Sequence, residues 1–193
     1  RNASMEKIIN DFTINIATAN GTGSQSANLI LLNSLYRMGT HVSGKNLFPS
    51  NIAGLPTWYI VRVSDHGYQA PGDETHIQVI MNIDTWGDDL AELKPGSVVI
   101  YNEDVKAPIE RKDLILYPAP MTSMARKINP KLAKMVSNMI YVGIMAEMLE
   151  IPQEIVEEAI SKQFNGKEKP LKLILKPQLW AESILRRIVK RKT

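Results

Sequence analysis

A glycine-containing turn between a strand-like run and a helix-like run is the part of this sequence best suited to hold a ligand. It consists of six residues: Gly21, Thr22, Gly23, Ser24, Gln25 and Ser26. An apolar run at residues 12–17 precedes it, and apolar residues at helical spacing follow it at about 27–38. Such a turn presents backbone N–H groups at a helix N-terminus, where the helix dipole favours an anion such as a phosphate. The pattern therefore predicts phosphate anchoring, although a tight turn that binds nothing fits it equally well.

Two cationic residues further along the chain are candidates to complete an anion site. The turn is an incomplete dinucleotide fingerprint, because Ser26 stands at the third glycine position and Lys45 stands where an Asp or Glu would bind a ribose hydroxyl. A lysine in that place disfavours NAD and suits a ligand with a 2′- or 3′-phosphate. Arg62, in the predicted strand at residues 57–64, is the remaining anion partner. The predicted cofactor-binding set is thus residues 21–26 with Lys45 and Arg62.

Catalytic and metal-binding patterns are weak in this sequence. Ser24 and Ser26 have no nearby base that would make either a nucleophile, and the acidic pairs at 88–89 and 157–158 are typical of solvated helix faces. There is no cysteine, which excludes disulfides, thiolate zinc sites and cysteine-ligated iron–sulfur clusters. The three histidines lack metal-ligand spacing. We expect neither a catalytic residue nor a metal site on this chain.

Strand-like and helix-like runs alternate through most of the chain. Strands are predicted at 12–17, about 40–43, 57–64, 76–81, 97–101 and 114–117, and helices at 27–38, 84–93, about 129–149 and 152–164. The helix near 129 begins with Asn129 as cap and Pro130 at the first position. This alternation predicts an α/β fold, with a mainly parallel, Rossmann-like sheet between helical layers.

The 193 residues suit one domain with a short appendage. Residues 1–4 precede Met5 and are interpreted as a cloning remnant, which leaves a domain at 5–166 and a basic tail at 167–193. Residues 162–193 have a net charge of +8 and the remainder −5, and residues 178–192 have the spacing of an amphipathic helix that would pack on the body or on a partner. A basic tail alone does not indicate nucleic-acid binding. No signal peptide or membrane span is evident, so we expect a soluble, cytoplasmic protein.

Three motifs in order resemble the gamma subunit or domain of the 2-oxoacid:ferredoxin oxidoreductases. They are GTGSQSA at 21–27, GKNLFPS at 44–50 and GLPTWYIVRVS at 54–64, and the likeness extends from Phe12 to about Phe164, with Asn138 and Gly143 in the long helix. The residue sequences of the second and third motifs are closest to those of the 2-oxoglutarate type, in which this domain is fused to the N-terminus of the alpha subunit. Many relatives have a glycine-richer turn where this chain has Gly23-Ser-Gln-Ser26. A serine carries a Cβ that limits backbone approach.

The resemblance implies a three-layer α/β/α domain with a mixed sheet. It implies a gamma component that acts with alpha- and beta-type subunits in converting a 2-oxoacid, such as pyruvate or 2-oxoglutarate, to acyl-CoA, with electrons passed to ferredoxin. The turn at residues 21–26 would lie near the phosphates of coenzyme A or at a subunit boundary, and residues 48–56 would face the partner domain. Thiamine diphosphate and iron–sulfur clusters would belong to the partner subunits. Two alternatives from the residues remain: an autonomous nucleotide-binding oxidoreductase and an assembly module that binds no ligand.

Overall fold

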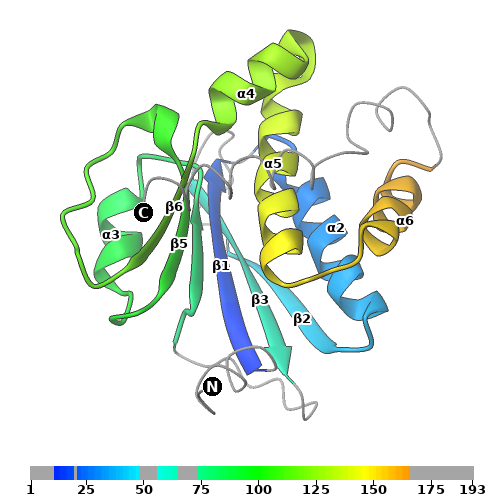
Figure 1. The fold of residues 1–193 in the computed structure, drawn as a ribbon, viewed down its shortest axis with the longest axis horizontal. Helices are drawn as coiled ribbons and strands as arrows, with labels where there is room; N and C mark the ends of the chain where they lie inside the picture. The colour runs from blue at the N-terminus through cyan, green and yellow to red at the C-terminus, as the bar shows by residue number, and fades with distance from the viewer. Residues whose placement is uncertain (1–10, 20, 48–55, 65–73, 166–193) are drawn as a thin grey trace.

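The computed structural model describes residues 11–19, 21–47, 56–64 and 74–165. These residues form a six-stranded sheet with helices on both of its faces (Figure 1). The strands are β1 (Asp11–Ala19), β2 (His41–Leu47), β3 (Pro56–Ser64), β4 (Ile77–Ile80), β5 (Val98–Asn102) and β6 (Ile115–Ala119). The helices are α2 (Ser24–Arg37), α3 (Trp86–Ala91), α4 (Met121–Ile128), α5 (Ala133–Met148) and α6 (Gln153–Gln163), with 3₁₀ turns η1 (Glu103–Val105) and η2 (Pro130–Leu132).

The sheet is mixed, with the strand order β2-β3-β1-β4-β5-β6. β1, β4, β5 and β6 run parallel, whereas β3 is antiparallel to both of its neighbours, β1 and β2. The predicted three-layer α/β/α class with a mixed, mostly parallel sheet is confirmed. In Figure 1, α2, α5 and α6 gather on one side of the sheet and α3 lies on the other.

The main core lies between the sheet and α2, α5 and α6. Alternate residues of a strand point to opposite faces, and Phe12, Ile14 and Ile16 of β1 are at most 2% exposed on the face that meets these helices. A smaller core lies beneath α3 on the opposite face. Its buried members are Ile80, Trp86, Leu90, Leu93, Val99 and Leu114.

β2 is longer than the sequence predicts. The expected strand covers only about 40–43, but pairing with β3 continues to Leu47, which lies opposite Trp58. The expected end falls at Gly44, a residue with low strand propensity, and the antiparallel pairing overrides that local preference. The prediction of a brief strand is therefore wrong.

The segment before the long helix contains a helix that is not among those predicted from the sequence. α4 is an amphipathic two-turn helix that buries Met121 and Ala125, and the helical spacing of these residues is the available signal. The predicted start signal after α4 is confirmed, since the Asn129 side-chain oxygen accepts from the backbone N–H groups of Lys131 and Leu132 at 3.0 and 3.1 Å. Pro130 then opens η2, from which α5 continues.

Two expectations concern residues outside the described ranges: the amphipathic helix at 178–192 and the partner-facing loop, of which only Pro56 is described. Within the described part of the chain, no helix combines the length and apolar character needed to cross a bilayer.

Candidate functional site

A cavity of about 760 Å³ opens at the carboxyl ends of β1, β4 and β5. Its walls come from the glycine turn after β1, the residues that end β4 and β5, and the α4–η2–α5 segment. From β1 the chain passes through α2 to β2 on one side, and from β4 it passes through α3 to β5 on the other. Adjacent parallel strands whose connections diverge in this way form a topological switch point, where α/β sheets characteristically bind ligands.

The glycine turn is held in place by its neighbours. Gly21 and Gly23 have φ angles of 79° and 81°, in the left-handed region that favours glycine. Between them, the Thr22 hydroxyl donates to the carbonyl of Ala19 at 2.8 Å. The Nδ2 group of Asn138, which is 3% exposed in α5, donates to the carbonyl of Thr22 at 2.9 Å. Hydrogen bonds thereby hold the turn on both sides, from β1 and from α5.

The three remaining residues of the predicted turn contribute differently. Ser24 opens α2 and is buried, and its hydroxyl oxygen accepts a hydrogen bond from Thr18 at 3.0 Å. Gln25 is exposed and Ser26 half-buried, and neither contributes to the cavity wall, unlike Gly21, Thr22 and Gly23. Ser24 therefore connects β1 to the start of α2, and the backbone of the first three turn residues faces the cavity.

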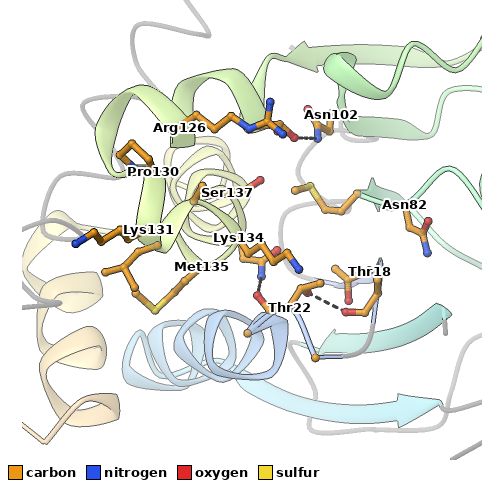
Figure 2. Close-up of a pocket in the computed structure, with 18 residues that line it drawn as sticks. Thr18, Thr22, Asn82, Asn102, Arg126, Pro130, Lys131, Lys134, Met135 and Ser137 are labelled. Carbon is orange, nitrogen blue, oxygen red and sulfur yellow. Dashed lines mark hydrogen bonds between the residues drawn. The ribbon is translucent and has the colours of Figure 1, made fainter. Parts of the chain in front are cut away.

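Three cationic side chains line the cavity, and the described lining contains no carboxylate. They are Arg126 of α4, Lys131 of η2 and Lys134 of α5, all exposed. Figure 2 shows Arg126 and Lys134 extending across the cavity, whereas Lys131 points away from it. Together with the N-terminus of α2, these charges give the cavity a positive potential that suits an anion.

Polar amides at the ends of the parallel strands form the opposite wall. The Asn102 side-chain oxygen accepts from the backbone N–H of Met121 at 3.1 Å, and its Nδ2 donates to the Thr122 hydroxyl at 2.8 Å, which fixes the start of α4. Asn82 follows β4, and its Nδ2 is buried without a hydrogen-bond partner among the described residues. These two residues give the wall opposite the cationic side chains a polar, uncharged character.

Helices α2 and α5, which carry the turn and Lys134, are joined by a buried hydrogen bond. The Tyr141 hydroxyl donates to the Asn28 side-chain oxygen at 2.6 Å, and both residues are at most 3% exposed. Burial raises the pKa of Tyr141, so its hydroxyl stays protonated and remains a donor. This bond fixes the two helices that hold opposite sides of the cavity.

Lys45 and Arg62 lie in a different cavity from the glycine turn. β3 separates β2 from β1, and Lys45 and Arg62 line a groove with Thr13 and Asn15 of β1. Thr18, which lines the turn cavity, is on the opposite face of β1 because it lies an odd number of residues from Thr13 and Asn15. Arg62 also forms an ion pair with Asp11. Of the predicted cofactor-binding set, residues 21–23 line the turn cavity, Lys45 and Arg62 line a cavity on the opposite side of the sheet, and residues 24–26 line neither.

The cationic residues of the turn cavity are not among those predicted from the sequence. The Asn129-Pro130 helix start is flanked in the sequence by Arg126, Lys131 and Lys134. This local signal predicts the helix, but it does not predict that these charged residues line the same cavity as the glycine turn. Asn82 and Asn102 follow predicted strands, and the carboxyl ends of parallel strands meet at one edge of a sheet. Among the described residues, no group of three or more His, Cys, Asp or Glu side chains is placed to hold a metal ion.

The fold and this cavity define an α/β domain with a cationic cavity at a topological switch point of its sheet. Residues 13–176 match the sequence profile of the pyruvate ferredoxin/flavodoxin oxidoreductase family, and the chain belongs to that family. It is 22% identical over 204 residues to the alpha subunit of 2-oxoacid:ferredoxin oxidoreductase 2 from Aeropyrum pernix, a match that covers 84% of this chain and 32% of the relative. The family resemblance predicted from the three motifs is confirmed.

Solved structures show the same fold. A 2-oxoglutarate:ferredoxin oxidoreductase from Magnetococcus marinus, with 2-oxoglutarate, coenzyme A and succinyl-CoA bound, superposes with a TM-score of 0.79 at 25% identity, over 90% of this chain and 31% of that one. The gamma subunit of a keto/oxoacid ferredoxin oxidoreductase from Geobacter sulfurreducens gives 0.74 at 18% identity, over 91% of this chain and 99% of that one. Pyruvate oxidoreductase subunit PORC from Thermotoga maritima gives 0.68 at 18%, over 90% and 96%.

The size of these relatives differs. The chain spans about a third of the Aeropyrum pernix and Magnetococcus marinus proteins but nearly the whole of the other two structures. The same domain thus occurs both as part of a longer chain and as a separate one.

Proposed function

We propose that this chain is the gamma component of a 2-oxoacid:ferredoxin oxidoreductase. The complex would decarboxylate a 2-oxoacid oxidatively to an acyl-CoA and pass the electrons to ferredoxin, with alpha- and beta-type subunits carrying thiamine diphosphate and the iron–sulfur clusters. Family membership and the likeness to a separate gamma subunit support this assignment. The 193 residues contain no cysteine, so they supply no cysteine ligand to such a cluster.

Within that complex, the turn cavity would bind the phosphate groups of coenzyme A. The observation that carries this proposal is that Arg126 and Lys134 extend into a cavity that the glycine turn also lines, with no carboxylate in the described lining. The backbone of residues 21–23, which lines the cavity just before α2, would complete the contacts to a phosphate. The Magnetococcus marinus relative binds coenzyme A, which makes this polyanion the first ligand to test.

The test uses the complex reconstituted with its alpha and beta subunits and measures the KM for coenzyme A. In the double variant Arg126→Gln/Lys134→Gln, we expect KM to rise about tenfold or more, because a hydrogen bond to a charged group contributes about 1.5–3 kcal/mol. The matched control is Lys127→Gln/Lys162→Gln, which removes two exposed cations outside the cavity lining. Size-exclusion chromatography would establish that both variants assemble normally.

The outcomes separate the proposed assignments. If the assembled double variant keeps the wild-type KM for coenzyme A, the cavity does not bind its phosphates and the domain acts in assembly alone. If the tagged chain recovers no subunits with thiamine diphosphate and iron from its source lysate, the gamma assignment fails. A melting temperature raised by NAD but not by coenzyme A would instead support an autonomous nucleotide-binding oxidoreductase.

A further inference from the structure

A second groove, of about 940 Å³, lies on the face of the sheet opposite α2 and α5. Its floor is formed by β1, β3 and β2, and one wall is formed by α3. We call it the sheet groove. The coenzyme A proposal does not use this groove, because the turn cavity lies on the other side of the sheet.

The strand registers place the floor residues in rows that run across the sheet. Residues directly opposite each other on neighbouring antiparallel strands share a face of the sheet. Read from β1 through β3 to β2, the three rows are Thr13-Arg62-Ser43, Asn15-Ile60-Lys45 and Ala17-Trp58-Leu47. All of these residues except Ala17 line the groove. The floor is therefore polar at the end that contains Arg62 and apolar at the end that contains Trp58.

Three polar atoms at the polar end are buried and have no hydrogen-bond partner among the described residues. They are the Thr13 hydroxyl oxygen, the Asn15 side-chain oxygen and Arg62 Nε, and Thr13 is only 3% exposed. Nearly all buried polar groups in native proteins form hydrogen bonds. The Asn15 oxygen requires a donor, Arg62 Nε requires an acceptor, and the Thr13 hydroxyl can use either. A polypeptide backbone supplies both kinds of group, which a simple anion or cation does not.

The α3 wall has negative charge that no described residue neutralises. Asp88 and Glu92 are exposed, line the groove and form no ion pair among the described residues. Asp89 between them is buried and accepts hydrogen bonds from Trp58 Nε1 at 2.9 Å and the Thr85 hydroxyl at 2.6 Å, so it joins the wall to the floor. A segment in the groove therefore meets free carboxylates on its α3 side, which favours lysine or arginine there.

The apolar end of the floor is only partly covered. Trp58 and Ile60 are half-buried, and Leu47 is 39% exposed. β1 and β3 are interior strands, and interior strands of α/β sheets are characteristically covered on both faces. Among the described helices, α3 is the one on this side of the sheet, and its apolar residues pack against β4 and β5 (Figure 1). The described residues thus place no helix over β1, β3 and β2 on this face.

We propose that the sheet groove docks an extended segment of the alpha-type subunit. The segment would place lysine or arginine side chains against Asp88 and Glu92 and apolar side chains against Trp58 and Leu47. Its backbone N–H and carbonyl groups would supply the hydrogen-bond partners that the polar end of the floor lacks.

The choice of occupant rests on the proposed function, which makes the alpha-type subunit a partner of this chain. The same domain forms about a third of two longer relatives and nearly the whole of two separate chains. Where the domain is a separate chain, no peptide bond holds it to the rest of the enzyme. A noncovalent surface must then do so, and the sheet groove has the mixed polar, apolar and charged lining that such a surface needs.

Charge reversal on the α3 wall tests the proposal. The tagged full chain with Asp88→Lys/Glu92→Lys is titrated with the alpha-type subunit, and biolayer interferometry gives the dissociation constant. We expect this constant to rise about tenfold or more, because like charges brought together at an interface oppose association. The increase should shrink as the salt concentration is raised, since added ions screen exposed charges.

The matched control is Glu147→Lys/Glu154→Lys, on α5 and α6. Each pair reverses one acidic residue in the first turn of a helix, Asp88 or Glu154, and one exposed residue at a helix C-terminal end, Glu92 or Glu147. Circular dichroism establishes that both variants are folded. Wild-type affinity in the folded α3 variant, or equal losses in the two variants, would overturn this inference and leave the gamma assignment in place. Absence of binding between the wild-type chain and either partner subunit would overturn both.

Zero-length carbodiimide cross-linking of the reconstituted wild-type complex, followed by peptide mass spectrometry, identifies the occupant without a substitution. We expect amide bonds from Asp88 or Glu92 to lysines of the alpha-type subunit, in a peptide that also contains apolar residues. A mixture of ¹⁴N- and ¹⁵N-labelled chain separates links within one chain from links between two copies. Links from α3 to its own chain, to a second copy or to the beta-type subunit, or no link from α3, would each overturn the proposal.

Discussion

The ring of Tyr59 on β3 lies against Gly44 on the neighbouring strand β2, in the space that a side chain at residue 44 would fill. A Cβ atom on Gly44 would lie 2.6 Å from the Tyr59 ring carbon Cζ and closer still to the hydroxyl oxygen. Gly44 pairs with Val61, so Tyr59 reaches it diagonally across the two strands. The glycine is therefore part of the packing of the β2–β3 hairpin.

Gly44→Ala is expected to destabilise the protein by about 1–3 kcal/mol, because the added methyl group displaces a buried ring. Urea denaturation measures the change in the free energy of unfolding. Gly87→Ala is the matched control, since a Cβ at Gly87 in α3 meets no atom within 4 Å. There alanine should be neutral or stabilising, by up to about 1 kcal/mol. Equal effects of the two substitutions would contradict the packing role of Gly44.

Removing the Tyr141 hydroxyl should weaken the link between α5 and α2. Tyr141→Phe leaves the buried Asn28 oxygen without its donor, which should cost about 1–3 kcal/mol of unfolding free energy. The double variant Tyr141→Phe/Asn28→Leu should recover part of this loss, because it removes both polar groups. Tyr36→Phe, at a side chain that is 70% exposed, is the control. A full loss that persists in the double variant would show that packing, rather than the hydrogen bond, stabilises this contact.

Most of the fold is predictable from the sequence because its strands and helices have clear periodicity. Residues 12–17 and 57–64 are strands in the structure, and Asn129 caps the turn that leads into the long helix. The full length of β2 is not predictable, because glycine has a low strand propensity. Glycine fits at residue 44 because the Tyr59 side chain, from another strand, fills the space beside it. Pairing between distant residues leaves no local periodicity to read.

The candidate site is predictable only in part, for a topological reason. Expecting Lys45 near the glycine turn assumes that the second strand lies beside the first, as in a dinucleotide-binding unit. Here β3 is inserted between them, and Lys45 lines the opposite face of the sheet. The order of the strands depends on pairing between residues far apart in the sequence, which local patterns do not reveal. Arg126 and Lys134 reach the turn from α4 and α5, the helices that follow the last strand.

The buried carboxyl of Asp89 should make stability depend on pH. Burial raises the pKa of Asp89 above its ordinary value, although hydrogen bonds from Thr85 and Trp58 lower it and partly offset the effect. Between the two pKa values, Asp89 keeps its proton in the folded state and releases it in the unfolded state, where its pKa is near 3.9. The stabilisation that this bound proton gives is therefore largest at low pH and is lost as pH rises through the folded-state pKa. Between pH 7 and 4, wild type should gain stability relative to Asp89→Asn.

Urea denaturation at several pH values in this range checks the prediction. Asp84→Asn removes an exposed carboxylate close to α3 in sequence and serves as control. A stability difference between wild type and Asp89→Asn that does not change with pH would show that Asp89 has the same pKa in both states.

Gly23 should be sensitive to substitution because of its backbone conformation. A Cβ atom at this position would have Met135 Cβ as its nearest neighbour at 3.9 Å, an ordinary contact, but the φ angle of 81° disfavours residues other than glycine. Gly23→Val should therefore lower stability and weaken coenzyme A binding, since a β-branched residue shifts the turn. Gly23→Asn, which tolerates this φ better, should keep the fold and most of the affinity. Unchanged coenzyme A affinity in folded Gly23→Val would argue against phosphate binding at the turn.

Asn138 offers a way to separate the positioning of the turn from its electrostatics. Its Nδ2 group supports the Thr22 carbonyl, and the residue lies in the wall of the cationic cavity. Asn138→Ala removes the support, and Asn138→Asp removes it and adds a negative charge facing a carbonyl oxygen. Both variants should have a lower melting temperature, with a larger decrease for Asp because its buried carboxylate also loses solvation.

If the cavity binds the phosphates of coenzyme A, the KM of the reconstituted complex should increase in the order wild type, Asn138→Ala, Asn138→Asp. The additional increase for Asp should shrink as salt is raised from low to high concentration, because added ions screen the repulsion between two negative charges. Equal KM values for the Ala and Asp variants would mean that no anion binds near Asn138. In that case the cationic residues of this cavity would contact an acidic surface of a partner subunit, and the same variants would alter subunit affinity instead.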